Sequence, residues 1–182
     1  MPKENELFRK QYRFYGRHAL RVIELTKEID SKAKLQVFQS AIDVYKAAPL
    51  VGYMYQRREP IDRTKDESGK VADKSIFPDQ MFDASQALKM DLRMIMLLDK
   101  EYEPDEEKRL EKALRKLGND EVDLERFEEY VRGGVDILYE KLIEGATTPE
   151  EYVIKMYEFM ADFNNFFNRE VSREDVLAAT RE

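Results

Sequence analysis

Residues 120–142 read DEVDLERFEEYVRGGVDILYEKL and carry a long, well-formed helical pattern. Large apolar side chains recur there at intervals of three and four residues, which places them on one face of an α-helix. Asp120 or Asp123 supplies the N-terminal cap, and Gly145 ends the segment. The apolar face consists of Leu124, Phe127, Val131, Val135, Leu138 and Leu142. We therefore predict an amphipathic helix that packs against a core.

Gly133 and Gly134 lie in the interior of this predicted helix. Two interior glycines cost on the order of 2 kcal/mol relative to alanines, so their presence calls for a structural reason. The ordinary reason is the close approach of another helix. The alternative is a kink or a groove for a partner.

The rest of the chain has the same helical character. We predict helices over about 4–29, 31–49, 78–102, 105–118 and 149–167, and a short last helix from residue 172. Pro49 either ends the second helix or kinks it, in which case residues 50–58 continue as a short helix. The segment Thr148-Pro149-Glu150-Glu151 is a capping box with proline at the first helical position. No stretch alternates convincingly as a strand. The sequence predicts an all-α fold, a single domain over 1–182 built as a bundle of about six or seven helices, with a mobile polar loop at about 59–75.

Composition excludes several classes of protein. The 182 residues contain no cysteine, which rules out disulfides, thiolate metal sites and cysteine nucleophiles. The N-terminus is charged from its third residue, unlike a secretory signal. Uncharged runs are far shorter than the roughly 20 apolar residues of a membrane span. We expect a cytoplasmic protein without membrane contact.

Charge is divided unevenly within a net charge of −7. Residues 1–70 hold 15 Lys and Arg against 10 Asp and Glu, whereas residues 71–182 hold 16 against 28. The basic part can pair with the acidic remainder, either within one molecule or between copies. It can also meet an anionic partner.

Arginines at four-residue intervals dominate the basic part, and no acidic residue lies between Glu6 and Glu24. On a helix over 4–29, these guanidinium groups fan across one face, opposite a face with aromatic side chains. A second basic cluster adjoins the polar loop. We predict partner contacts for Arg9, Arg13, Arg17, Arg21, Arg57 and Arg58. The expected partner is a protein with an acidic surface or a second copy of the chain, and nucleic acid is the alternative. A solvated or internally paired face is the competing interpretation.

No pattern in the sequence points to catalysis. There is no phosphate-binding glycine loop, no nucleophile elbow and no histidine–glutamate zinc motif. His18 is the single histidine, and beside arginines it is expected on a helix surface without a partner that would make it a general base. We therefore predict no catalytic, cofactor-binding or metal-binding residues, no evident small-molecule substrate, and no enzymatic activity.

Aromatic residues gather near the C-terminus and are expected to belong to the core. Members that remain exposed become anchors for an interface. The set comprises Tyr152, Tyr157, Phe159, Phe163, Phe166 and Phe167.

Four strings of the sequence resemble a group of uncharacterised small helical bacterial proteins associated with gene clusters for defence against phage and foreign DNA. They are AAPLVGYMYQRREPID (47–62), IFPDQM (76–81), MIMLLDKEY (94–102) and EYVRGGVDILYEKL (129–142). The resemblance implies a small accessory subunit that works beside larger proteins. We thus expect a non-catalytic interaction module, and the alternative is a nucleic-acid-binding protein or regulator that uses the basic N-terminal helix.

Overall fold

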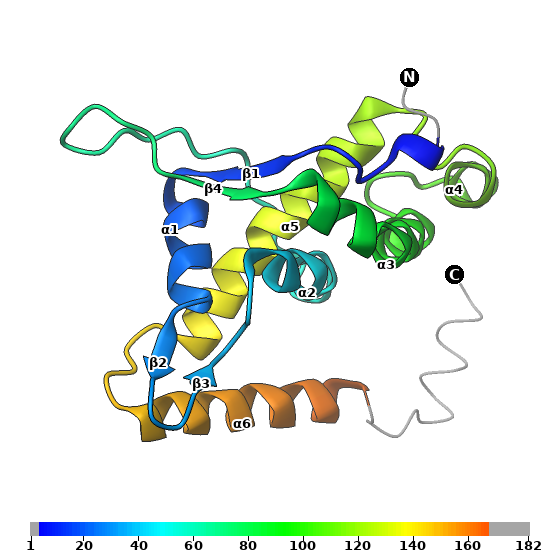
Figure 1. Cartoon of the computed structure of the whole chain (residues 1–182). Coiled ribbons are helices and arrows are strands. Elements are labelled where there is room, and N and C mark those ends of the chain that lie inside the picture. The colour runs from blue at the N-terminus through cyan, green and yellow to red at the C-terminus, as the bar shows by residue number, and fades with distance from the viewer. Residues whose placement is uncertain (1–3, 168–182) are drawn as a thin grey trace.

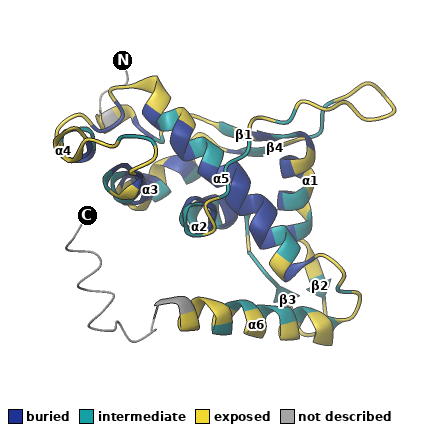
Figure 2. Cartoon of the chain, turned by 180° about the vertical axis from the view of Figure 1, so that it is seen from behind, coloured by how far each residue is buried: buried dark blue, intermediate teal, exposed yellow. Residues whose placement is uncertain are grey.

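Helix α5 (Glu121–Leu142) is the centre of the computed structural model, which describes residues 4–167 (Figure 1). Every residue from Tyr130 to Leu138 is buried, so the middle of α5 is covered on all its sides (Figure 2). Asp120 caps the helix by accepting a hydrogen bond from the amide of Val122 at 3.0 Å. The predicted apolar helix is confirmed, with α5 as the core of the fold.

Helices α1, α2, α3 and α6 pack against α5 from different directions, and α4 completes the helical part (Figure 1). Helix α4 packs against α3, and α6 lies along the opposite end of the molecule from α4. Together with α5 these are the six α-helices of the described residues: α1 (Gly16–Leu25), α2 (Ala41–Met54), α3 (Pro78–Leu98), α4 (Glu106–Leu114) and α6 (Pro149–Phe167). A short 3₁₀ helix, η1 (Glu4–Glu6), precedes them.

The closest helix contact joins α2 to α5 through glycines. A Cβ atom on Gly134 would lie 1.8 Å from the carbonyl oxygen of Ala48, and one on Gly52 would lie 2.1 Å from that of Tyr130. On Gly133, a Cβ atom would lie 1.9 Å from the carbonyl oxygen of Arg57. The predicted close approach of another helix is therefore confirmed at Gly134, whereas Gly133 meets the backbone of the segment that follows α2.

Two small antiparallel sheets make the fold mostly helical rather than purely α. Strand β1 (Tyr12–Tyr15) pairs with β4 (Asp73–Ile76), with Tyr12 opposite Ile76 and Tyr15 opposite Asp73 (Figure 1). Strand β2 (Glu28–Asp30) pairs with β3 (Leu35–Gln36) in a short hairpin. The all-α prediction is correct for the helices and wrong for these four strands.

The helix predicted over 4–29 is the largest error. Residues 12–15 are extended, with Phe14 buried and Arg13 exposed on alternate faces. Gly16 then takes φ = +55°, a left-handed conformation that turns the strand into α1. A Cβ atom at this position would lie 2.5 Å from the Asp62 carboxyl group. Four arginines therefore never share one helix face.

Two further boundaries differ from the prediction. The second helix begins at Ala41 rather than near residue 31, and it continues through Pro49 to Met54, which agrees with the second of the two expectations for Pro49. The segment expected as a loop over 59–75 contains a bridge between Lys65 and Val71, and its last residues belong to β4, which begins at Asp73. Its mobility stays a prediction. Its tip is closed by Asp66, whose Oδ1 accepts hydrogen bonds from the amides of Ser68 and Lys70. The short helix predicted from residue 172 lies outside the described residues.

Candidate functional site

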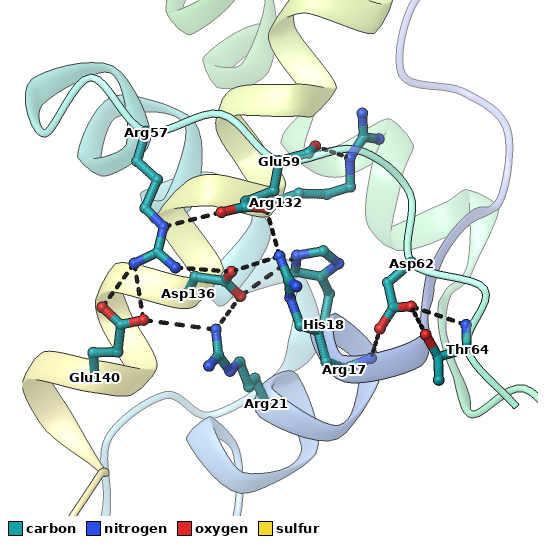
Figure 3. A network of polar contacts seen from close by, with 10 residues as sticks. All are labelled: Arg17, His18, Arg21, Arg57, Glu59, Asp62, Thr64, Arg132, Asp136 and Glu140. Carbon is teal, nitrogen blue, oxygen red and sulfur yellow. Dashed lines mark hydrogen bonds and ion pairs between the residues drawn. The ribbon is translucent and has the colours of Figure 1, made fainter. Parts of the chain in front are cut away.

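Asp136 is the centre of a buried network of charges on α5. Its side chain is charged and fully buried, and its sequence neighbours Val135 and Ile137 are apolar. Arg132 and Glu140 stand one helical turn before and after it, on the same face of α5. This face turns toward α1 and toward the segment that follows α2 (Figure 3).

Helix α1 supplies three cationic or polar side chains to Asp136. Arg17 Nη2 lies 3.3 Å from Oδ2, His18 Nε2 lies 3.4 Å from Oδ1, and Arg21 also forms an ion pair with Oδ1. Burial acts to raise the pKa of Asp136, but the hydrogen bonds and charges of His18 and Arg21 outweigh it, and the pKa lies below the ordinary value. Asp136 is therefore an ionised, buried carboxylate.

The segment after α2 closes the network from the other side. Arg57 Nη2 lies 3.3 Å from Asp136, and Nη1 donates to both carboxylate oxygens of Glu140 at 2.8 and 2.7 Å. Glu59 accepts from Arg17 and from Arg57 Nε. Because such paired, partly buried contacts are charge-assisted, they hold the three segments in one geometry (Figure 3).

Asp62 caps the N-terminus of α1, although it lies 45 residues after Arg17 in the sequence. Tyr15 occupies the cap position but offers no side-chain hydrogen bond, so Asp62 Oδ2 accepts from the amide of Arg17 at 2.7 Å instead. Hydrogen bonds from Thr64 and then from the Arg17 amide lower the pKa of Asp62 to about 2. A carboxylate at a helix N-terminus also meets the positive end of the helix dipole.

A cavity of about 220 Å³ adjoins this network beneath β1. Residues of β1, His18 of α1, Asp62, and Glu128 and Arg132 of α5 line it. Arg132 is held by Glu125 at 2.6 Å and by the carbonyl oxygen of Glu59 at 2.7 Å. Burial raises the pKa of Glu128 to about 7, against the lowering effect of Arg132. The cavity thus has a charged floor with one carboxyl group that titrates near neutrality.

Residues 17–169 match the family described as DNA sulphur modification system-associated protein 4. The chain belongs to this family. No curated protein and no solved structure matches the chain. Membership confirms the resemblance to defence-associated bacterial proteins that the four sequence strings suggested, and it associates the chain with the DNA sulphur modification system.

In this family member, five of the six arginines predicted to bind a partner form ion pairs with carboxylates of the chain itself. Arg17, Arg21 and Arg57 contact carboxylates of the Asp136 network, and Arg58 contacts Glu101 at 2.9 Å. The interpretation of an internally paired face therefore describes these four arginines and also Arg13, which pairs with Asp73. Whether they also contact a partner stays a prediction.

The remaining two arginines lie apart from the network. Arg9 lies over the ring of Phe82, 4.9 Å from its centroid, and Arg13 pairs with Asp73 at 3.6 Å on the surface of the β1–β4 sheet. Both are exposed, as is Arg17, whereas Arg21, Arg57 and Arg58 are partly buried.

Sequence reasoning missed two parts of the site and misplaced a third. Asp136 and Glu140 were not singled out, although a carboxylate within the apolar run from Val135 to Leu138 was a usable signal. His18, expected on a helix surface, is 1% exposed because its helix turns that side toward α5. The described residues contain no cluster of three or more His, Asp or Glu arranged to hold a metal ion.

The C-terminal aromatic residues divide between core and surface. Tyr152 and Phe159 pack against the core, whereas Tyr157 is 74% exposed; Phe163 is 39% exposed, and its ring lies 6.3 Å from that of Phe159. The side chains of Phe166 and Phe167 lie outside the described part of the structure. Among the described residues, no helix combines the length and the apolar character needed to cross a membrane.

Proposed function

We propose that the chain is a non-catalytic accessory subunit of the DNA sulphur modification system and that helix α6 docks it onto a protein partner. The exposed apolar surface of α6 carries this proposal. Tyr157 is 74% and Met160 69% exposed, and Val153 and Ile154 are each more than half exposed. Large apolar side chains concentrated on one solvent-facing helix are typical of an interface.

The attachment of α6 to the body supports the same proposal. A stripe of Tyr152, Met156 and Phe159 packs against the core, but none of the described residues of α6 is fully buried. The helix nevertheless has a well-formed start, because Glu151 accepts hydrogen bonds from the amides of Thr147 and Thr148. A capped helix with an uncovered apolar side is suited to lie in the groove of another protein.

Charge defines the partner more closely. Helix α6 carries four acidic residues and a single lysine. The complementary surface is therefore an apolar groove bordered by Lys and Arg. The acidic partner expected from the sequence rested on six arginines, five of which pair with the chain's own carboxylates. The N-terminal helix of the nucleic-acid alternative does not form as predicted.

Co-purification with the other proteins of the DNA sulphur modification system tests the proposal. The double substitution Tyr157→Ser with Met160→Ser removes two exposed anchors from α6. We expect it to reduce recovery of the partner at least about tenfold, since a single aromatic hot spot contributes about 2 kcal/mol or more. Circular dichroism should show an unchanged melting temperature.

The matched control is Leu110→Ser with Leu114→Ser on α4, where both leucines are exposed one helical turn apart. This variant should retain the partner. Retention of the partner by the α6 variant, or an equal loss by the α4 variant, would contradict the assignment of α6. A captured protein counts in favour only if it belongs to the system and is lost with the α6 substitutions.

A further inference from the structure

Helix α3 exposes a row of apolar side chains that neither the Asp136 network nor the docking helix α6 uses. The helix packs against α2, α4 and α5 and lies on the side of the molecule away from α1 (Figure 1). Four residues recur at intervals of three and four, so they form one row, the α3 stripe. They are Ala87, Met90, Met94 and Leu98. Ala87 is exposed, and Met90 and Leu98 are each 56% exposed.

No unpaired charge is exposed along the α3 stripe. The charged residues of this part of the helix are Lys89 and Asp91, which are buried, and Arg93, which pairs with Glu4. The stripe continues in this way for about three turns, or about 17 Å. Methionine side chains adapt to differently shaped partners and are frequent at protein-binding surfaces. An exposed apolar row of this length is typical of an interface.

Asp91 places a buried carboxylate at the edge of the α3 stripe. It follows Ala87 by four residues and precedes Met94 by three, so it lies beside both on the helix surface. Asp91 is 9% exposed, and no hydrogen bond or ion pair among residues 4–167 offsets its burial. Its oxygens are not among the fully buried polar atoms that lack a partner. The carboxylate therefore reaches the surface at the stripe, where a cation of another molecule has access to it.

This unpaired carboxylate is unfavourable for the fold on its own. A buried ion without a partner costs free energy, and aspartate is a poor residue for the interior of a helix. Residues that conflict with the local structure in this way concentrate at functional sites. A Lys or Arg side chain from a partner would form a charge-assisted hydrogen bond with Asp91 and offset the cost.

The charges around the α3 stripe favour the same kind of partner. Asp83 precedes Ala87 by one helical turn, and Asp79 stands one turn earlier; both are exposed and without an ion pair among the described residues. Helix α6 of a second copy does not fit, because its four acidic residues would meet these carboxylates. The stripe is complementary to a basic, apolar surface on a different protein.

We propose that the α3 stripe binds an amphipathic helix of another protein, with a Lys or Arg of that helix on Asp91. Helices that dock in this manner present apolar residues at i, i+3, i+4 and i+7, which is the spacing of the stripe itself. Met90, Met94 and Leu98 contact the apolar face, and further basic residues meet Asp83. Because the site lies on α3, one chain can hold this partner and the partner of α6 together.

Fluorescence anisotropy with a designed peptide tests the site. The probe is a fluorescein-labelled helical peptide of about 18 residues, with leucine at the i, i+3, i+4 and i+7 positions and lysine elsewhere. Its counterpart carries glutamate in place of lysine. In about 0.3 M salt, which screens exposed charges, the lysine peptide should bind saturably and at least about tenfold more tightly than the glutamate peptide.

Variants locate the binding. Asp91→Asn keeps the shape of the side chain and should weaken binding of the lysine peptide at least about fivefold. Met90→Ser with Leu98→Ser removes two exposed anchors and should weaken it at least about tenfold. The matched control is Tyr157→Ser with Met160→Ser on the acidic helix α6, which should bind like the unmodified chain. Circular dichroism checks that each variant is folded.

Four results would overturn the proposal. They are the absence of saturable binding of the lysine peptide, equal binding of the two peptides, unchanged binding in Asp91→Asn, and a loss in the α6 variant as large as that in the Met90 and Leu98 variant. Because no α3 variant alters α6, failure of this site leaves the proposed docking by α6 to its own co-purification test.

Discussion

Asp91 is a buried carboxylate without an ion pair among the described residues. It lies on α3 with 9% of its surface exposed. Burial alone raises its pKa from 3.8 to about 6. Its ionised form is therefore disfavoured in the folded state, and the side chain opposes folding once the pH exceeds its unfolded pKa.

The substitution Asp91→Asn should stabilise the fold at pH 8. The raised folded pKa means that the folded state binds more protons between about pH 4 and 6, so stability falls as the pH rises through that window. A shift of this size corresponds to a gain of about 3 kcal/mol at most for the variant. Urea unfolding followed by circular dichroism measures it.

At pH 3.5 the carboxyl group is largely protonated in both states, so the variant and the original chain should differ much less. Equal stabilisation at pH 3.5 and pH 8 would show that the ionisation of Asp91 is not the cause. A loss of stability at pH 8 would mean that the carboxylate has a favourable role.

At the scale of single elements, helices α2 and α5 can pack closely because glycines without side chains lie at their contact. Gly134 lies against Ala48, and Gly52 lies against Tyr130, with carbonyl oxygens where Cβ atoms would stand. Alanine at such positions improves helix propensity by about 1 kcal/mol but forces the helices apart.

We expect Gly134→Ala to lower the free energy of unfolding by about 2 kcal/mol or more. The steric conflict involves backbone atoms, which cannot rotate away as a flexible side chain would. Chemical denaturation measures the change. The comparison is Ala87→Gly on the exposed side of α3, which should cost about 1 kcal/mol from propensity alone. Stabilisation by Gly134→Ala would contradict the close packing.

Local signals allowed several elements to be predicted. The capping box at Thr148 and the proline at residue 78 mark the starts of α6 and α3, because both signals act within one helical turn. The strand at Tyr12–Tyr15 was missed because its partner lies about 60 residues further along the chain. The apolar spacing around it fits a helix as well as a short strand, and only the long-range pairing separates them.

At the scale of the whole molecule, the uneven charge distribution has a structural explanation. Cations of the basic N-terminal part meet carboxylates of the acidic C-terminal part across the Asp136 network (Figure 3). The sequence indicated that the basic and acidic parts could pair, but it could not identify which carboxylates contact the arginines. The Asp136 network and the cavity both form from segments that are remote in sequence, so their geometry follows from tertiary packing.

Asp136→Asn should destabilise the whole fold by about 3 kcal/mol at pH 7. The substitution removes a buried anion shared by Arg17, Arg21 and Arg57, and breaking a buried pair costs about 3–5 kcal/mol. The lower end applies because Glu59 and Glu140 still contact these arginines. Since the folded pKa lies below 3.8, this contribution is present above about pH 4 and is lost as the pH falls further.

Thermal or urea unfolding at pH 7 measures the effect. The control is Glu24→Gln, which removes a surface pair with Lys27 and should change stability by less than about 1 kcal/mol. A similar loss of stability in the two variants would mean that the buried Asp136 network contributes no more to the free energy of unfolding than a surface ion pair does.

The long reach of these contacts has a consequence for synthesis on the ribosome. Arg17 leaves the exit tunnel 119 residues before Asp136, the carboxylate that it meets in the finished molecule. At about 5–20 residues per second, the two are separated by roughly 6–24 s of translation. Until β4 emerges, about 60 residues after β1, the edge of β1 has no partner strand, and the arginines of this segment help keep it hydrated.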